Sequence, residues 1–511
     1  MSARLPRLAA ILLASTLTVA VSPQASAAPA AVADPPGAAL DWIESELAAE
    51  GSYLTVSFDD GMGGVSTFPD YGLTIDAILA LTAAGRGAEA ATADAAAFVE
   101  DNVGSYISGA DFGYPSERYA GPIAKAMLMA AAHGEATGAF GGFDLDAELR
   151  GLLTESGADV GRFSDAPDPT NTFGGDFSNG FGQALAVMAL ARTADGVPES
   201  ALDFLLDQQC PGGAFRGDYT TTGGCASDAS ATVDATAFAL QALVTVAPTC
   251  AVRRSVTDAV TALVAGQNDS GAFGGESGSN TNSTGLAAVA LRSLGETGAA
   301  DAAAAFVAGL QLDAGDDAGA VALNTGAFAS AGDGVQVLER DGFRRATTQG
   351  VFAFGLPSYG EIGAPAIDPA DFTPCGDPPA PAGTVSAPSV VVGGSLTVTG
   401  TGFAPGELVD VTLHSTPIDL GTVTADAAGT ALLTFTVPAD LEPGEHSVEL
   451  VGRTSGVIVS VAFEALAAPT AQRALPATGR TTGAQAAAGA GLVALGGALL
   501  ALERRRRAAL I

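Results

Sequence analysis

Few residues of this sequence are suited to hold a metal ion or to bind a polyanion. Its 511 residues include three histidines, one tryptophan and four cysteines, and only 22 lysines and arginines stand against 56 aspartates and glutamates. The formal net charge is −34 at pH 7. A field of this sign repels polyanions at short range and favours cations and solubility. Nucleic acid is therefore not expected as a partner.

The scarcity of histidine and the spacing of the cysteines argue against a bound metal. His133 is the only histidine before residue 414, and no two cysteines form a CxxC pair, so a zinc site is not expected. Aspartates gather at 59–60 and at 313–317, but neither group has the spacing of a calcium-binding loop. No metal and no cofactor are expected.

Apolar runs of membrane-spanning length are absent from the body of the chain and occur only near its ends. Residues 1–27 combine two arginines, an apolar stretch from Leu8 to Val21 and the small-residue site Ala25-Ser26-Ala27. This order is typical of a secretory signal peptide, which is removed on export. The body of the chain is therefore expected to be exported.

The C-terminal end has three parts in a characteristic order. A short tag at 475–479 precedes an apolar segment at 484–502, and a basic tail with four consecutive arginines follows at 503–511. The tag consists of Leu475, Pro476, Ala477, Thr478 and Gly479. Together the three parts resemble the LPxTG sorting signal of Gram-positive surface proteins.

That resemblance implies that a sortase cuts between Thr478 and Gly479 and joins the carboxyl group of Thr478 to peptidoglycan. Sortase, as the enzyme that acts on this chain, and peptidoglycan are then the expected partners. The expected location is the cell wall, at the extracellular face of a Gram-positive bacterium. A plain C-terminal transmembrane anchor is the alternative interpretation.

Four cysteines in an exported chain indicate two disulfides, although four cysteines allow three pairings. Cys210 and Cys225 flank one glycine-rich loop, which favours their pairing. The second disulfide is then Cys250–Cys375, which would tie the end of the first domain back to its middle.

Two linkers divide the body of the chain. A proline-rich linker at 377–384 separates a region rich in alanine and glycine, 35–376, from a region of β-type segments, 385–465. A second linker at 466–474 leads to the sorting motif. Two folded domains are therefore expected between the signal peptide and the wall anchor.

The first region contains an internal repeat of about 50–60 residues. Apolar helix-like segments recur six times, and each follows another helical segment and a glycine-rich loop. The apolar segments are 74–81, 123–132, 182–191, 233–243, 284–294 and, more weakly, 347–354. The segments before them are 38–50, 91–106, 145–155, 200–209, 252–267 and 300–310. Six such units predict a closed α/α ring with alternating outer and inner helices.

The loops between units share a motif. Residues 209–215 (QCPGGAF) and 267–273 (QNDSGAF) both read Q-x3-G-x-F, and Gln311 with Gly315 keeps its first half. The motif resembles the QW-type repeat of the prenyltransferase and terpene cyclase superfamily, with phenylalanine in place of the usual tryptophan. The resemblance implies an (α/α)6 toroid, a fold shared by enzymes and binding proteins. The glutamines are expected to bond carbonyl groups between units, and the aromatic rings to wedge there.

The catalytic features of that superfamily are incomplete here. The region has too few histidines and basic residues for the zinc and diphosphate sites of protein prenyltransferases. The DxDDTA acid segment of hopene-type cyclases matches residues 232–237, of which only Asp234 is retained. Without flanking aspartates, Asp234 is expected to titrate as an ordinary carboxylate and is a weak general acid. Residues 224–227 lack the second half of the GCGEQ thioester motif.

Structural roles are preferred for the other charged residues of the apolar segments. Asp234 and Asp76 are interpreted as helix-start carboxylates favoured by the helix dipole rather than as ligands or catalysts. Lys125 is interpreted as a snorkelling surface residue or an ion-pair partner.

The inner segments are apolar almost all round, which predicts that they are buried between the outer helices and the central lumen. The lumen is then either filled by side chains or an apolar cavity. The residues considered for the cavity mouth are Asp76, Asp234, Phe215 and Phe273. An apolar ligand is preferred to a sugar, because the only tryptophan, Trp42, is predicted on an outer helix.

The second region alternates short strands with turn signals. The expected strands are 389–392, 395–400, 408–414, 421–425, 431–438 and 446–451. The pattern resembles a bacterial immunoglobulin-like module, which implies a spacer role.

These features predict a multidomain chain: an all-α (α/α)6 toroid, an all-β Ig-like sandwich and a C-terminal transmembrane sorting helix. The preferred function is a wall-anchored, non-catalytic binding module for a small apolar ligand or a partner protein. One alternative is a secreted terpenoid cyclase or prenyltransferase-like enzyme with Asp234 as general acid. Another is a toroid similar to cobalamin carriers.

Overall fold

The structure is a computed structural model that describes residues 32–275, 278–373, 380–426, 428–453 and 455–468. The predicted signal peptide, sorting motif, membrane span and basic tail all lie outside the described residues. Within the described ranges, no helix is both long and apolar enough to cross a membrane. The described chain folds into a helical region followed by a β-rich region, in the order predicted from the sequence.

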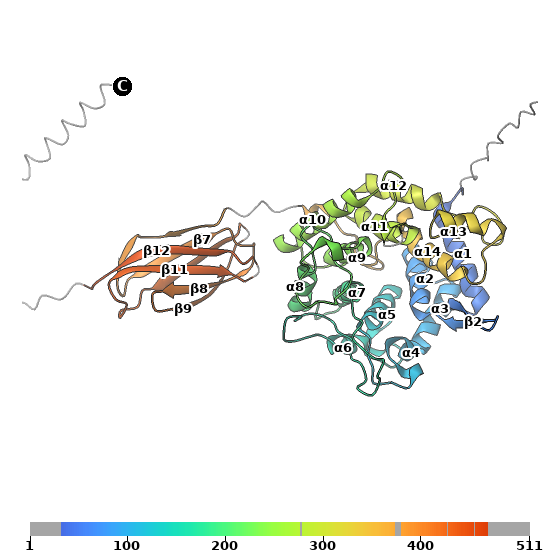
Figure 1. Cartoon of the computed structure of the whole chain (residues 1–511), viewed down its shortest axis with the longest axis horizontal. Helices are drawn as coiled ribbons and strands as arrows, with labels where there is room; N and C mark the ends of the chain where they lie inside the picture. The colour runs from blue at the N-terminus through green and yellow to red at the C-terminus, as the bar shows by residue number, and fades with distance from the viewer. Residues whose placement is uncertain (1–31, 276–277, 374–379, 427, 454, 469–511) are drawn as a thin grey trace, which may run out of the picture.

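Six helices form the inner wall of a ring, and each packs against the next (Figure 1). The last of them, α14, packs against the first, α2, so the ring is closed. The inner helices are α2 (Tyr71–Ala83), α5 (Ala120–His133), α7 (Gly180–Leu190), α9 (Val233–Leu243), α11 (Thr281–Ser293) and α14 (Arg340–Gly350). The first five of them coincide with the predicted apolar segments to within a few residues, whereas α14 begins earlier than the predicted segment 347–354, whose second half forms the 3-10 helix η5.

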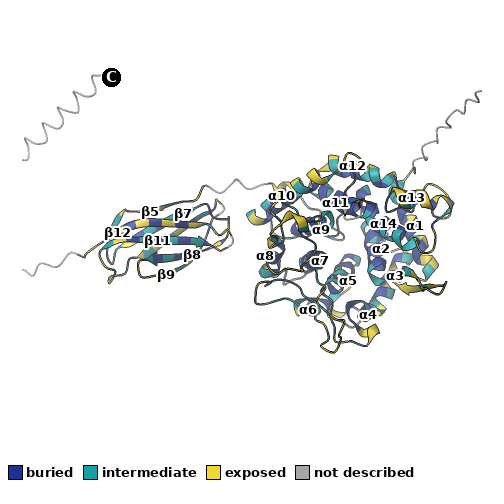
Figure 2. Cartoon of the chain, viewed as in Figure 1, coloured by how far each residue is buried: buried dark blue, intermediate teal, exposed yellow. Residues whose placement is uncertain are grey.

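An outer helix packs on each inner helix and covers its outward face. The outer helices are α1 (Pro35–Glu50), α3 (Ala90–Asp101) with the short α4 (Val103–Ile107), α6 (Leu145–Arg150), α8 (Glu199–Asp207), α10 (Cys250–Gly266) and α12 (Thr297–Ala308). Figure 2 shows the resulting layers, with buried inner helices inside outer helices that have an exposed side. The alternation of outer and inner helices that the sequence predicts is confirmed.

Shorter elements lie in the loops of the ring. The helix α13 (Thr325–Ser330) precedes α14, and two small antiparallel pairs are β1 (Thr55–Asp59) with β2 (Val65–Pro69), and β3 (Gly274–Gly275) with β4 (Gly278–Ser279). The 3-10 helices are η1 (Ala110–Phe112), η2 (Thr137–Ala139), η3 (Asp228–Ser230), η4 (Ala331–Asp333), η5 (Val351–Phe354) and η6 (Pro369–Phe372).

Alanine and glycine on the inner helices allow close helix packing. At the start of α7, a Cβ atom added to Gly182 would lie 3.1 Å from the Cα atom of Gly121 on α5. Larger side chains at these positions would force the two helices apart at the end where the ring opens.

The seam between the last and the first unit is held by buried polar contacts. Glu46 on α1 is 3% exposed and pairs with Arg340 at 2.6 Å and with Arg344 at 2.7 Å. The indole Nε1 of Trp42 donates a hydrogen bond to Asp317 at 3.4 Å. Trp42 therefore lies on an outer helix, as the sequence predicts, and helps to join residues 275 positions apart in the chain.

Glutamine side chains join successive units. The amide nitrogen of Gln209 donates to the carbonyl oxygens of Gly213 and Ser255, and that of Gln267 donates to Gly271 and Ala299. In each case one acceptor lies in the glutamine's own loop and the other in the next outer helix. The bridging role that the sequence predicts is thus present in the structure.

The third bridge closes the ring and corrects one detail of the motif. Gln311 donates to Pro35, the first residue of α1, and to Gly319 at 3.0 Å. The glycine equivalent to those of the other loops is therefore Gly319, and the prediction that pairs Gln311 with Gly315 is wrong. The longer loop hides the repeat from a search for fixed spacing.

The bridging loops share glycines in the left-handed region. The φ angle is between 91° and 99° at Gly161, Gly213 and Gly319, and it is 84° at Gly271. A Cβ atom at any of them would lie within 2.5 Å of a carbonyl oxygen of the next outer helix. Only glycine satisfies both the backbone angle and the close approach.

Phe215 and Phe273 pack in the core between units and not at the mouth of the lumen. They are 1% and 0% exposed. Their N–H groups donate to the hydroxyl groups of Thr236 and Thr284 on the inner helices. Their interpretation as mouth residues is therefore wrong, whereas their wedge role is supported by this burial.

The first predicted disulfide is present. Cys210 and Cys225 are bonded and close the loop that precedes α9. Cys250 is also disulfide-bonded, and Cys375, its predicted partner, lies outside the described residues.

The β-rich region consists of two sheets that share one apolar core. Its strands are β5 (Ala382–Val385), β6 (Ser389–Val391), β7 (Ser395–Thr401), β8 (Leu408–His414), β9 (Ile418–Thr424), β10 (Thr430–Thr436), β11 (Gly444–Gly452) and β12 (Ile458–Leu466). One sheet has the order β10-β7-β5 and the other β6-β12-β11-β8-β9, in which only β6 and β12 run parallel. The sequence analysis missed β5, which begins inside the expected linker, and β12.

The left-handed glycines of the bridging loops, which we call the glycine joints, allow a test of how the units are joined. In Gly271→Ala, the left-handed backbone and a Cβ atom 2.3 Å from the carbonyl oxygen of Ala302 should lower the free energy of unfolding by about 2–4 kcal/mol. Gly266→Ala, at the end of α10 and with no heavy atom within 4 Å, is the control and should change it by about 1 kcal/mol or less, in the stabilising direction. Urea denaturation of the two variants and the wild type measures both effects, and equal effects would contradict the role of Gly271 in joining the units.

Candidate functional site at the mouth of the lumen

One end of the lumen is closed by the chain that follows α14. Residues 356–363 cross against the C-terminal ends of the inner helices. A Cβ atom added to Gly360 would lie 3.0 Å from the carbonyl oxygen of Gln241 on α9, and one added to Gly363 would lie 3.1 Å from that of Ala132 on α5. This floor segment, residues 356–363, therefore touches two inner helices.

Arg192, two residues after the end of α7, holds the floor segment in place. Its guanidinium group donates hydrogen bonds to the carbonyl oxygens of Tyr359, Gly360 and Ile362 at 2.8–3.1 Å. One side chain thus satisfies three backbone acceptors in a place where the chain has no regular structure.

The side chain of Tyr359, a residue of the floor segment, points into the lumen and fills it there. Its side chain is 2% exposed, stacks on Phe238 at 5.7 Å and lies 4.8 Å from the ring of Phe352. Burial, and to a lesser degree the charge of Asp76, raises the pKa of Tyr359 well above its ordinary value. The lumen is packed with aromatic rings at this depth.

The other end of the lumen lies at the N-terminal ends of the inner helices. Most inner-helix residues are fully buried, but a few positions in the first turns remain partly exposed. These positions include Gly121, Lys125, Phe181, Asp234, Phe238, Asn282 and Arg345. We call these residues, together with Gln349 in the last turn of α14, the mouth. Tyr71 and Gly72 are also partly exposed, but they lie against the outer helices α3 and α4.

One half of the mouth is polar. Asp76 on α2 is 4% exposed and pairs with the Nζ atom of Lys125 on α5 at 2.7 Å. Lys125 also donates to the carbonyl oxygen of Gly72 at 2.9 Å, and Gln349 on α14 lies 3.5 Å from Asp76. The charge of Lys125 is therefore balanced within the ring.

These contacts decide between the interpretations of Asp76 and Lys125. Asp76 lies beyond the first turn of α2, so its interpretation as a helix-start carboxylate is wrong. Lys125 is an ion-pair partner, one of the two roles that the sequence suggests.

The other half of the mouth is aromatic. Phe181 is the only partly exposed residue of α7, all of whose residues are described. Its ring meets that of Phe238 on α9 edge to face, with 5.7 Å between the ring centres. Phe238 in turn stacks on Tyr359. An apolar group entering the mouth would contact these rings before it reached the floor.

Asp234 stands beside the aromatic half, one turn above Phe238 on the same face of α9. It is in the first turn of α9, as predicted, and Ser283 on α11 hydrogen-bonds its carboxylate. Burial raises the pKa of Asp234, and the hydrogen bond from Ser283 only partly offsets this. The expectation of an ordinary carboxylate is therefore wrong, because desolvation acts without flanking acids.

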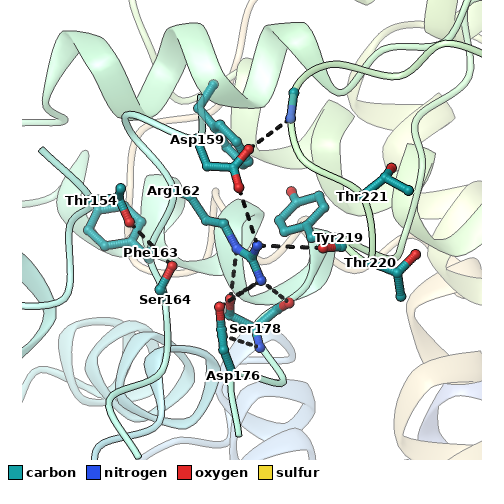
Figure 3. A network of polar contacts seen from close by, with 12 residues as sticks. Thr154, Asp159, Arg162, Phe163, Ser164, Asp176, Ser178, Tyr219, Thr220 and Thr221 are labelled. Atoms are coloured by element: carbon teal, nitrogen blue, oxygen red, sulfur yellow. Dashed lines mark hydrogen bonds and ion pairs between the residues drawn. The ribbon is translucent and has the colours of Figure 1, made fainter. Parts of the chain in front are cut away.

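Two long loops at the rim are tied together by Arg162 (Figure 3). Its guanidinium group bonds the hydroxyl and carbonyl oxygens of Ser178 and pairs with Asp176 at 2.9 Å. It also lies 5.2 Å from the ring centre of Tyr219, and the guanidinium group of Arg216 lies 5.5 Å from the same centre. These contacts join loop 151–179 to the disulfide-closed loop 209–232.

The sequence analysis did not identify the Arg162 cluster or the floor residue Tyr359. Their partners are far apart in the chain, as in the 57 residues between Arg162 and Tyr219. The sequence signal that could have pointed to the Arg162 cluster was an arginine in each of two long, acidic loops.

A small cleft of about 190 Å³ opens at the edge of the mouth, between the starts of α5 and α7. Its lining includes Tyr119, Asp165 and Phe177. Asp165 accepts hydrogen bonds from the N–H groups of Ala120 and Phe177, and burial raises its pKa. The cleft extends the apolar surface of the mouth outward, where Phe177 is 69% exposed.

The acidic clusters considered for calcium serve the fold. Asp317 accepts hydrogen bonds from Trp42 and from the N–H group of Val335, and Asp60 caps the turn of the β1–β2 hairpin. Among the described residues, no group of three or more histidines, cysteines and carboxylates is arranged to hold a metal ion.

Asp234 generates a pH-dependent prediction. Below its ordinary pKa of 3.8 the carboxyl group of Asp234 is protonated in both the folded and the unfolded state, so folding buries no charge at this position. As the pH rises towards the raised native pKa, the native state binds more protons than the unfolded state, and the stability contributed by Asp234 falls. Asp234→Asn should therefore stabilise the protein near neutral pH, and the gain should shrink towards about pH 4.

Urea denaturation across this pH range measures the gain. Asp269→Asn, an exposed aspartate before α11, is the matched control and should show no such trend. A gain for Asp234→Asn that is the same at every pH would contradict the assignment.

No family model and no curated protein matches the sequence. Among solved structures, a UGL variant with dGlcA-Glc-Rha-Glc is 12% identical, covers 64% of this chain and 98% of its own, and has a TM-score of 0.41. The type II terpene cyclase MstE from Scytonema, in complex with geranylgeranyl dihydroxybenzoate, is 13% identical, with coverages of 62% and 97% and a TM-score of 0.39. These distant likenesses do not assign an activity to the ring.

Proposed function

We propose that this chain is a cell-wall-anchored surface protein whose helical ring binds a small, largely apolar molecule at the mouth of the lumen. The observation that supports this most is the arrangement at the mouth, where aromatic rings lie on one side and hydrogen-bonding groups on the other, above a packed floor. Binding sites for small molecules commonly combine an apolar lining with a few placed polar groups.

The depth of the recess favours binding over conversion of a long polyene. Tyr359 and Phe352 occupy the lumen below Phe238, so a ligand contacts only the first two turns of the inner helices. A cyclase-like reaction would require the chain of its substrate to extend past this point. Asp234 then serves to orient a polar group of the ligand rather than to protonate an alkene.

The proposal places the ring outside the cell. The signal-peptide pattern and the sorting motif support this location, and the disulfide between Cys210 and Cys225 suits an oxidising compartment. In this proposal the β-rich region is an Ig-like spacer between the ring and the wall, and a partner protein is the alternative occupant of the mouth.

Removal of an aromatic ring tests the binding site. In Phe181→Ala the apolar contact of the ligand shrinks, and binding of the neutral dye Nile red to the secreted chain should weaken about tenfold. Phe173→Ala, which removes a rim phenylalanine that is 91% exposed, is the control and should leave binding unchanged. Fluorescence titration measures both, and equal affinities of wild type and Phe181→Ala would contradict the site.

Wall attachment has its own test. Thr478→Ala should remove the bond-forming residue, so that the protein moves from the wall fraction released by muramidase to the membrane and medium fractions. Thr481→Ala, just past the motif, should remain in the wall. Immunoblots of the fractions from a sortase-bearing Gram-positive host decide the matter, and wall-bound Thr478→Ala would refute sorting through this motif.

A further inference from the structure

Three buried polar atoms of the lumen have no hydrogen-bond partner within the described part of the chain. They are Oδ1 of Asp234, Oδ1 of Asn282 and the phenolic oxygen of Tyr359. The first two residues lie in the first turns of α9 and α11, at the mouth, and Tyr359 belongs to the floor segment at the other end of the lumen. A buried polar group without a partner is unfavourable, and such groups mark places that a ligand completes.

Two of these atoms come from the first turns of α9 and α11, which pack against each other. Asn282 directly precedes Ser283, whose hydroxyl group hydrogen-bonds Asp234. Asn282 is also the only partly exposed residue in the first turns of α11, so its side chain faces the lumen. A carboxylate oxygen and an amide oxygen are both acceptors, and together they call for a ligand that donates hydrogen bonds.

The rings beside this acceptor pair add a preference for positive charge. Phe238 lies one turn below Asp234, and Phe181 packs edge to face on Phe238. The π faces of such rings attract an ammonium or guanidinium group, most strongly where water is excluded. A donor that is also cationic therefore suits both the acceptors and the rings.

The cations already present do not neutralise Asp234. Lys125 pairs with Asp76 at 2.7 Å, and Arg345 pairs with Asp70 and Asp341. Among the ion pairs of the described residues, none includes Asp234. The chain as a whole, with a formal net charge of −34, also attracts cations.

We propose that the mouth of the lumen binds an organic cation, with an ammonium group at Oδ1 of Asp234 and Oδ1 of Asn282 and its hydrocarbon part against Phe181 and Phe238. The inference rests on the proposed function and adds the charge and the orientation of the ligand. The hydroxyl group of Tyr359, below the rings, meets any polar atom at the far end of the ligand.

A pair of matched probes tests the charge. The 2-phenylethylammonium ion and 2-phenylethanol have nearly the same shape, and only the first is cationic. Isothermal titration of the secreted chain near neutral pH should show about tenfold or tighter binding of the ammonium ion, because hydrogen bonds to charged groups are the stronger ones. In Asp234→Asn this preference should disappear.

Two further variants separate the parts of the site. Asp269→Asn makes the same change of charge outside the mouth and should keep the preference for the ammonium ion. Phe238→Leu keeps the apolar volume but loses the π face, so it should weaken the ammonium ion more than the alcohol.

The outcomes distinguish the two proposals. Equal binding of the ammonium ion and the alcohol to wild type overturns the cation site but leaves the apolar binding site standing. Binding of neither probe, together with no effect of Phe181→Ala on Nile red, overturns both. A preference that survives Asp234→Asn also overturns the assignment to Asp234.

The same titration identifies the source of the cation. A Gly-Lys-Gly peptide carries its ammonium group on a side chain. If the peptide binds more tightly than 2-phenylethylammonium, the natural occupant is a lysine side chain of a partner; if it binds more weakly, the occupant is a free amine.

Discussion

Closure of the ring is the constraint on which the rest of this structure depends. The lumen exists only because α14 returns to α2, and the seam is held by the buried carboxylate of Glu46 between Arg340 and Arg344. Buried ion pairs cost desolvation energy and are retained where they fix one geometry. Here they select the one register in which Gln311 reaches Pro35 and the sixth unit meets the first.

Local sequence patterns were sufficient to predict the repeating part of the fold. The apolar periodicity located all six inner helices, and the glutamine motif located two of the joints. The third joint escaped because its loop is longer, so Gly319 does not stand at the spacing seen at Gly213 and Gly271. Strands β5 and β12 also escaped, because one lies in a proline-rich stretch and the other has few turn signals near it.

The candidate site was only partly predictable. Asp234 and Asp76 could be singled out as carboxylates on apolar helices, but the ring decides their different surroundings. Asp76 gains Lys125 from the neighbouring helix, whereas Asp234 is left with one hydroxyl donor and a raised pKa. The floor residue Tyr359 could not be foreseen, because a segment without repeat pattern brings it into the lumen. A recess that keeps unpaired polar atoms trades stability for the capacity to bind.

The floor segment has a mechanical consequence. Only η6 follows it in the ring, so tension on the chain from its C-terminal side reaches η6 first and then Tyr359, before it reaches any inner helix. Phe372, buried where η6 packs on α10, and the three hydrogen bonds from Arg192 are the contacts that resist such a pull. A pull that frees Phe372 would therefore act next on the hydrogen bonds from Arg192 and on the ring of Tyr359.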